Sequence, residues 1–265
     1  MAHEGGTTSV SFSSDGGSLA TGGYDSSIRV WDTNGWRETQ RLSGPHRGHV
    51  AFLPYSDVLI CAGLSNDATV YVCNRKTWQV QRTVGGLSNV WCVSPLPGKR
   101  QVAFIQPDDT PDDSHWKPIQ IWNVDDWSLV ARIGIDVEDI YALSYSQNGK
   151  QAAVSFGKGL VSVWDVDFTH KIVEFVAHDN ATWAAAFSPS GDMLATGGAD
   201  NVARLWDTTS WNMLHELPHK KLQQALDHKN GVLCAEFSPD ARTLVTGGLD
   251  GLVTVWNLGE PILGA

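Results

Sequence analysis

Three groups of polar side chains in this sequence contain the residue types of a nucleophilic triad. In each group, a histidine is followed by a threonine, an aspartate and a tryptophan at spacings of 18, 4 and 6 residues. Histidine, aspartate and a hydroxyl group can together activate a nucleophile, with the histidine as general base. Because a catalytic site is needed once whereas a packing device recurs in every repeat, we predict that these groups are structural and that the chain is not an enzyme. The groups are His3, Thr21, Asp25 and Trp31; His178, Thr196, Asp200 and Trp206; and His228, Thr246, Asp250 and Trp256.

A second motif, His215-Glu216-Leu217-Pro218-His219, matches the HExxH string of zinc proteases. That chemistry requires both histidines on one helical face, about one turn apart, with the glutamate as base. Proline is unfavourable inside a helix, and the repeat described below places residues 211–217 in a strand, where positions i and i+4 lie ~13 Å apart. We therefore predict that the match is coincidental and that the chain uses no metal and no other cofactor.

Charge and composition restrict the class of protein further. The chain has 29 acidic and 19 basic residues, a formal net charge of -10, which on average repels nucleic acid and anionic membranes. Its 42% hydrophobic and 18% charged residues are typical of a globular protein. No apolar run approaches the roughly 18 residues of a membrane span, no secretory signal is present, and the four cysteines form no CxxC pair. We expect a cytoplasmic protein without a membrane partner, and nucleic acid is disfavoured.

A tryptophan-centred repeat extends along the whole chain. Its markers are separated by 42, 49, 42, 42 and 50 residues, and a second tryptophan follows five residues later in four repeats, at the expected start of the last strand. Within each repeat, short strands alternate with turn residues and no helical periodicity is present. Six such units predict four-stranded propeller blades and leave no residues for a second domain. The markers are Trp31, Cys73, Trp122, Trp164, Trp206 and Trp256, and the second tryptophans are Trp36, Trp78, Trp127 and Trp211.

The chain resembles the WD40-repeat β-propeller family, whose units carry a histidine before strand a, a serine or threonine in strand b, an aspartate in the b-to-c turn and a tryptophan in strand c. The resemblance covers the entire chain and implies an all-β, six-bladed propeller of four-stranded antiparallel blades in one domain, 1–265. It also implies a hydrogen-bonded chain from carboxylate to imidazole to hydroxyl to indole within a blade, which agrees with the donors and acceptors of these groups. Three repeats depart from the pattern, since Cys73 replaces a tryptophan, Lys158 replaces an aspartate, and the third repeat has an insert there. The expected blades are 1–44, 45–86, 87–133, 134–175, 176–218 and 219–265.

Two inserts lengthen the connections between the expected strands. The acidic insert is residues 107–115, and the basic insert, residues 219–227, joins blade 5 to blade 6. In the family, b-to-c and d-to-a loops open on the same face of the disk, so the resemblance implies that both inserts lie on one face. Because loops on a rigid scaffold often carry recognition, we expect partners to bind on this face.

The first strand of each blade begins at the mouth of the central channel, where family propellers often bind peptides. The aligned residues at this mouth are Thr8, His49, Asn89, Tyr141, Trp183 and Leu233, and the residues before the turn aspartates include Tyr24 and Leu249. Aromatic side chains are suited to anchoring an interface, and the alternative is that they pack between the blades. The candidate partner-binding residues are Tyr24, Asn89, Tyr141 and Trp183.

The sequence therefore predicts a non-catalytic scaffold that binds a protein or peptide partner on the face bearing the b-to-c and d-to-a loops. Two alternatives stay open: a regulatory or sensor segment of a larger multidomain enzyme, and an accessory subunit of an RNA-processing complex, which the acidic charge disfavours. By register, only residues 260–265, with Pro261 among them, are left for the last outer strand. We expect the ring to be open or weakly closed between blades 6 and 1, with self-association or a completing strand at this seam.

Overall fold

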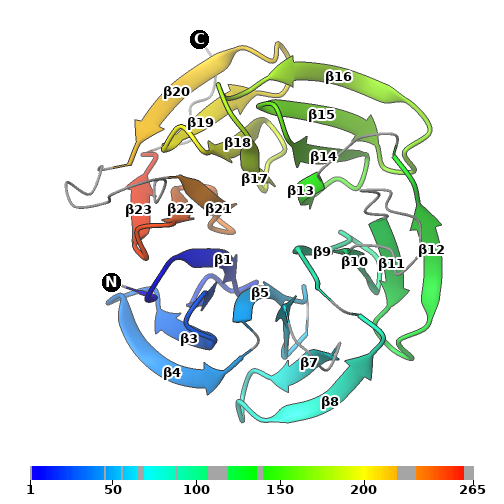
Figure 1. Cartoon of the computed structure of the whole chain (residues 1–265), viewed down its shortest axis with the longest axis vertical. Helices are drawn as coiled ribbons and strands as arrows, with labels where there is room; N and C mark the ends of the chain where they lie inside the picture. Colours follow the sequence, from blue (N-terminus) through cyan, green and yellow to red (C-terminus); the bar gives the residue numbers. More distant parts are fainter. Residues whose placement is uncertain are drawn as a thin grey trace.

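The structure, a computed structural model, describes residues 2–44, 46–54, 56–64, 69–87, 89–106, 119–135, 140–219 and 231–259. Every regular element in these ranges is a β-strand, and the strands form six antiparallel sheets. The sheets stand around a central axis as the blades of a propeller, with the first and the last sheet side by side (Figure 1). The predicted all-β, six-bladed propeller is therefore confirmed.

Each blade consists of strands that follow one another in the sequence, which we name a to d from the axis outwards. Blade 1 contains β1 (Thr7–Phe12), β2 (Ser18–Gly23), β3 (Ser27–Asp32) and β4 (Arg37–Ser43). Blade 2 contains β5 (His46–Phe52), β6 (Val58–Leu64), β7 (Thr69–Asn74) and β8 (Val80–Gly85). Blade 3 contains β9 (Cys92–Pro95), β10 (Gln101–Ile105), β11 (Ile119–Asn123) and β12 (Leu129–Ile133).

The second half of the ring is built in the same way. Blade 4 contains β13 (Ile140–Tyr145), β14 (Gln151–Phe156), β15 (Leu160–Asp165) and β16 (Lys171–Val176). Blade 5 contains β17 (Thr182–Phe187), β18 (Met193–Gly198), β19 (Val202–Asp207) and β20 (Met213–Pro218). Blade 6 has three strands in the described part of the chain, β21 (Val232–Phe237), β22 (Thr243–Gly248) and β23 (Val253–Asn257). The position expected for its fourth strand, like most of both inserts, lies outside the described residues.

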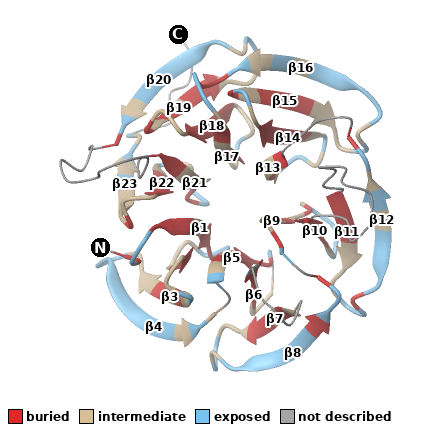
Figure 2. Ribbon diagram, viewed as in Figure 1, coloured by how far each residue is buried: buried red, intermediate tan, exposed pale blue. Residues whose placement is uncertain are grey.

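The apolar cores lie between neighbouring blades, so burial decreases from the axis to the rim (Figure 2). In blade 5, every residue of β18 is buried, whereas β20 is exposed at all but one position. Between blades 3 and 4, Ile105 packs in one cluster with Ile140 and Leu143. Inner strands that are covered on both faces need apolar or small residues at consecutive positions, which explains why their sequences do not alternate between polar and apolar residues.

The second tryptophan of the repeat lies in the turn before strand d, whereas the sequence predicted it at the start of that strand. The turn places this residue in the left-handed region, with φ of 52°, 57°, 60° and 57° at Trp36, Trp78, Trp127 and Trp211. A bulky residue rarely adopts this conformation, so packing must stabilise it. Trp211 packs on Phe175 of the preceding blade, with the ring centroids 5.9 Å apart.

Blades 6 and 1 are joined in the described part of the chain, which contradicts the expected opening of the ring. The Phe12 backbone N–H donates to the Glu236 carboxylate at 2.9 Å, and the Cys234 thiol lies 3.7 Å from the Thr7 carbonyl oxygen. Residues of both blades also share one apolar cluster. In the described part of the chain, blade 6 is the blade whose strand c, β23, has no strand d beside it. A completing strand would therefore extend blade 6 and would not be needed to close the ring.

Candidate functional site

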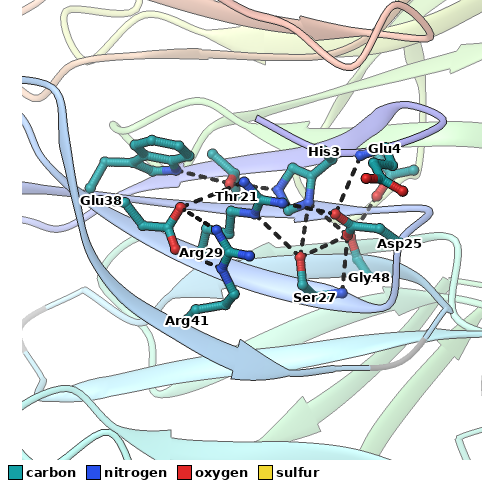
Figure 3. Close-up of polar contacts among 11 residues, drawn as sticks. His3, Glu4, Thr21, Asp25, Ser27, Arg29, Glu38, Arg41 and Gly48 are labelled. Carbon is teal, nitrogen blue, oxygen red and sulfur yellow. Dashed lines mark hydrogen bonds and ion pairs between the residues drawn. The ribbon is translucent and has the colours of Figure 1, made fainter. Parts of the chain in front are cut away.

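In blade 1, the four predicted residues form one hydrogen-bonded chain, and Figure 3 labels His3, Thr21 and Asp25 of this chain. His3 Nδ1 lies 2.9 Å from Asp25 Oδ1, and His3 Nε2 lies 2.8 Å from Thr21 Oγ1. The Trp31 indole N–H donates to the same Thr21 hydroxyl at 3.0 Å. The histidine comes from the segment before strand a, the threonine from strand b, the aspartate from the b-to-c turn and the tryptophan from strand c. The chain of bonds therefore ties two strands, the turn between them and the segment before strand a together within one blade.

Blade 5 repeats this arrangement with nearly the same distances. His178 Nδ1 lies 2.9 Å from Asp200 Oδ1 and His178 Nε2 lies 2.8 Å from Thr196 Oγ1. Trp206 Nε1 donates to Thr196 Oγ1 at 3.0 Å. Thr21 and Thr196 are completely buried and use their hydroxyl groups in these bonds. Neither hydroxyl is accessible to solvent, and each group ties together the strands of its own blade.

Blade 6 takes its histidine from an unexpected place. Trp256 Nε1 donates to Thr246 Oγ1 at 2.8 Å, as in the other two groups. The imidazole at this hydroxyl belongs to His219, whose Nε2 lies 2.7 Å from Thr246 Oγ1 and whose ring centroid lies 5.7 Å from that of Trp256. His228, which the spacing predicts for this role, lies outside the described residues. Within the described ranges, the Asp250 carboxylate accepts the backbone N–H of Leu252.

The two histidines of the HExxH string lie in different surroundings. Residues 213–218 form strand β20, so the string does not lie on a helix. His215 is exposed on the rim, whereas His219 is buried. In the described ranges, no group of three or more histidine, cysteine, aspartate or glutamate side chains is placed to hold a metal ion.

In the other three blades, the marker residue of strand c bonds to a single side chain. In blade 4, Trp164 Nε1 donates at 2.8 Å to Ser162, two residues earlier on the same strand. In blade 3, Trp122 donates at 3.2 Å to Gln120, also two residues earlier. In blade 2, the thiols of Cys61 and Cys73 share a hydrogen bond, and this bond with burial raises the pKa of Cys61. Each substitute joins fewer elements than the four-residue chain does.

The turn aspartates of blades 1 and 5 are ionised, and each is paired with an arginine four residues later. Arg29 Nη2 lies 3.2 Å from Asp25, and Arg204 Nη1 lies 2.6 Å from Asp200. Burial favours the neutral carboxyl groups, but the hydrogen bonds donated by the histidine and other neighbours outweigh it and hold the pKa of both aspartates well below the usual range. Burial lowers the pKa of His3 in spite of Asp25, so this ring is neutral at pH 7.

The mouth of the channel encloses a cavity of about 140 Å³. It lies where strands a begin and strands b end, so it opens on the face of the b-to-c and d-to-a connections. Three of the four candidate binding residues line it, namely Tyr24, Tyr141 and Trp183. Arg47, His49 and Trp91 complete the polar and aromatic part of the wall, and Thr8, Leu233 and Leu249 fill the rest.

Blade 3 presents Trp91 at the mouth, whereas the sequence alignment predicts Asn89. Asn89 is exposed and does not line the cavity. Asn89 stands five residues before Ser94-Pro95, as Trp183 stands before Ser188-Pro189, but β9 ends at Pro95 and the turn follows at Leu96-Pro97. Counting from Leu96-Pro97 moves the mouth position by two residues and would have found Trp91.

The aromatic side chains at the mouth pack closely against glycine backbone and against one another. A Cβ atom on Gly6 would lie 2.9 Å from the Tyr24 ring, and one on Gly231 would lie 2.2 Å from the Trp183 ring. Both rings therefore rest directly on glycine backbone at the start of strand a. Trp91 and Tyr141 pack on one another across blades 3 and 4, with centroids 6.2 Å apart.

Arg47 brings a positive charge to this aromatic wall. Its Cζ atom lies over the Tyr24 ring at 5.1 Å and over the Trp91 ring at 4.8 Å from the centroids, distances at which a guanidinium is attracted to a π face. Loss of solvent contact and the nearby Arg47 charge lower the pKa of His49 to about 3, so His49 is neutral. Among the described residues that line the mouth, Arg47 is thus the one with a formal charge, and its role was not predicted from the sequence.

Below the mouth, a cavity of about 160 Å³ runs between the a strands. At three junctions between blades, a polar residue on strand a accepts a backbone N–H from the next blade at 2.9 to 3.0 Å. Two of these residues are serines and the third is Glu236, whose pKa burial raises to about 8. The pairs are Ser11 with Phe52, Ser144 with Phe187, and Glu236 with Phe12.

Comparison with known proteins agrees with this architecture. The WD domain, G-beta repeat family matches residues 1–32, 169–207 and 220–257, which include strands of blades 1, 5 and 6. Autophagy-related protein 16 of Arabidopsis thaliana is 23% identical over 209 residues, which are 78% of this chain and 39% of that protein. Protein HIR1 of Cryptococcus neoformans is 27% identical over 256 residues, or 80% of this chain and 28% of that protein.

WD repeat-containing protein SL1-17 of Schistosoma mansoni is 23% identical over 195 residues, which are 71% of this chain and 61% of that protein. The matched region thus spans less than two thirds of the length of each of these relatives. Within its described ranges, the chain forms no helix with the length and hydropathy of a membrane span. The repeat family, the relatives and the six-bladed ring together identify this chain as a WD40-repeat protein.

Proposed function

We propose that this propeller is a non-catalytic scaffold that binds a peptide segment of a partner protein at the mouth of its channel. The observation that carries the proposal is the aromatic cavity formed by Tyr24, Trp91, Tyr141 and Trp183 on one face of the ring. Propellers of this family generally serve as interaction scaffolds, which supports the same class of function. The cytoplasmic location and the absence of catalysis are parts of this proposal.

The two ends of the channel differ in a way that favours this face. The opposite end is a wider opening of about 470 Å³, lined by the a-to-b turns with prolines such as Pro54, Pro189 and Pro239. The mouth on the other face is narrower and offers four aromatic rings and a guanidinium. Aromatic and arginine side chains are enriched among the residues that contribute most to protein interfaces. A peptide would therefore gain more from contact with this end.

A completing strand on blade 6 is a second candidate interaction. The outer edge of β23 has no neighbouring strand in the described ranges, and Val255 on this strand is 40% exposed. Unpaired N–H and C=O groups of an edge strand can pair with another chain. A strand from a partner, or from a second copy, would extend the sheet there. That the chain acts as a sensor segment of a larger enzyme stays a hypothesis.

Affinity capture with matched variants tests the mouth. We would compare the native chain with a Tyr141→Ala/Trp183→Ala variant and with Trp36→Ala, which removes a 40% exposed tryptophan far out on blade 1. Each partner captured by the native chain is then purified and titrated against the three proteins. We expect the double variant to weaken its binding by about tenfold or more, and Trp36→Ala to leave it unchanged. Equal affinity for all three proteins, at equal melting temperatures, would move the site away from the mouth.

A further inference from the structure

Arg47 differs from the other half-buried arginines of this chain. Arg29 and Arg204 each form ion pairs with carboxylates. The Arg47 guanidinium is half-buried and lies over two aromatic rings, yet it makes no hydrogen bond or ion pair with the described part of the chain. A guanidinium carries five N–H donors, and removing a charge from water without a partner costs free energy. Within the described ranges, these donors are therefore open to an anion that approaches the mouth.

The backbone directs this side chain to the mouth. Strand β5 contains an extra residue between His46 and His49 relative to its partner β6. Arg47 lies in this bulge with φ of 52°, the left-handed conformation that arginine rarely adopts. Bulges re-aim side chains, and strained backbone of this kind occurs often at functional sites. The local geometry thus places the guanidinium against the rings of blades 1 and 3 instead of along the strand.

The charge on the cavity wall indicates the charge of the group that binds there. Among the described residues that line the mouth cavity, Arg47 is the one with a formal charge, and His49 beside it is neutral. The site is therefore positive on a chain with a formal net charge of -10. A guanidinium that lies over aromatic rings can still offer its N–H groups for the bidentate contact that a carboxylate makes.

The size of the cavity limits what can enter. A cavity of ~150 Å³ in another protein accommodates a benzene molecule, so about 140 Å³ has room for one side chain of a peptide. The neighbouring rings of Trp91, Tyr141 and Trp183 offer apolar surface to the residues on either side of it.

Building on the proposed function, we propose that the mouth binds an acidic residue of a linear partner peptide, whose side-chain carboxylate pairs with the Arg47 guanidinium. The flanking residues of the peptide then contact the aromatic wall. Because the anchor is a charge and its surroundings are rings, the preferred sequence is a glutamate or aspartate next to an apolar residue.

Fixed-residue peptide libraries test this assignment. Four fluorescent nonapeptide libraries carry Glu, Gln, Lys or phosphoserine at the centre, with mixed residues elsewhere, and their binding is measured by anisotropy. We expect the native chain to prefer the Glu library over the Gln library by about 10- to 100-fold, the range of a charged hydrogen-bonded pair. Arg47→Gln should abolish this preference, and Arg37→Gln, which removes an exposed arginine of β4, should retain it.

Three results would overturn the proposal: equal binding of the Glu and Gln libraries, a Glu preference that survives Arg47→Gln, or a preference for phosphoserine over Glu. The proposed function can fail separately. If the Gln library binds the native chain as well as the Glu library does, and both bind the Tyr141→Ala/Trp183→Ala variant more weakly, the mouth is a peptide site without a carboxylate anchor. If this double variant leaves the binding of every library unchanged, the mouth is not the peptide site.

A measurement on the native chain makes the test independent of variant folding. Raising the salt concentration from about 0.05 M to about 0.5 M should weaken binding of the Glu library, because it screens the ion pair, and should leave the Gln library unaffected. Equal salt dependence of both libraries would contradict the proposal. Arg47→Lys keeps the charge without the planar fork, and we expect it to retain part of the preference for Glu.

Discussion

The backbone N–H of Phe12 donates to a carboxyl oxygen of Glu236 at 2.9 Å, which joins the first blade to the last. At the other two junctions that use this device, the acceptor is a serine hydroxyl. A serine does not titrate near neutral pH, whereas the pKa of Glu236 is raised by burial from 4.5 to about 8. The closing junction of the ring is therefore sensitive to pH.

We predict that replacing this carboxyl group changes the pH dependence of stability. The folded chain holds a proton on Glu236 that the unfolded chain loses above pH 4.5, so its contribution is complete below pH 4.5 and is lost as the pH rises to about 8. Relative to the native chain, Glu236→Gln should gain ~1–3 kcal/mol of unfolding free energy between these pH values. Urea unfolding at about pH 5, 6.5 and 8 measures this. A constant difference between the two proteins would contradict the prediction, and Glu174→Gln on the exposed rim is the control.

The four-residue chain of blade 5 should contribute more than the single indole bond of blade 4. Thr196→Val leaves both the His178 imidazole and the Trp206 indole without their shared partner, and we expect a loss of ~2–4 kcal/mol. Ser162→Ala leaves only the Trp164 indole unpaired, with an expected loss of ~1–2 kcal/mol. Urea denaturation of the two variants compares these losses, and equal losses would show that the longer chain adds nothing.

The depressed pKa of Asp200 predicts a loss of stability in acid. The contribution of an aspartate with a lowered pKa is present above its ordinary pKa of 3.8 and is lost as the pH falls through its folded value. Asp200→Asn should therefore cost ~2 kcal/mol at pH 7, and this difference should shrink below about pH 4. Asp167→Asn, on an exposed turn, should cost little at any pH. A difference that stays constant down to about pH 2 would contradict the assigned pairing.

Histidine substitutions decide which imidazole completes blade 6. His219 is buried, bonds to Thr246 and packs on Trp256, so we expect His219→Ala to lower the unfolding free energy by ~2–3 kcal/mol. His215 is exposed, and His215→Ala should have little effect. The spacing in the sequence predicts instead that His228 has this role. A large loss of unfolding free energy in His228→Ala, with a small loss in His219→Ala, would show that His228 has this role, as the spacing predicts.

The parts of the fold that repeat could be predicted from the sequence, because each repeat reports independently on the same local geometry. His3 and His178 stand at one spacing from their threonines, and the structure gives both the same contacts. The prediction failed where a repeat is irregular. In blade 3 the sequence predicts Asn89 at the mouth, but the turn after strand a is at Leu96-Pro97 and Trp91 lines the cavity.

The charged anchor of the mouth could not have been predicted in this way. Arg47 reaches Tyr24 and Trp91, which belong to the blades on either side of its own. Its position depends on a bulge and on a positive φ that no residue type signals. The closure of the ring was missed for a related reason, since the expectation considered only a clasping outer strand. The contact between Glu236 and Phe12 joins residues 224 positions apart in the chain.

Every described sheet is formed by one unbroken stretch of the polypeptide, and neighbouring sheets adhere through side chains and a few isolated bonds. A tandem duplication or a loss of one such stretch would therefore leave the remaining sheets intact. The connectivity itself therefore sets no fixed number of blades, because each repeat contacts only its neighbours.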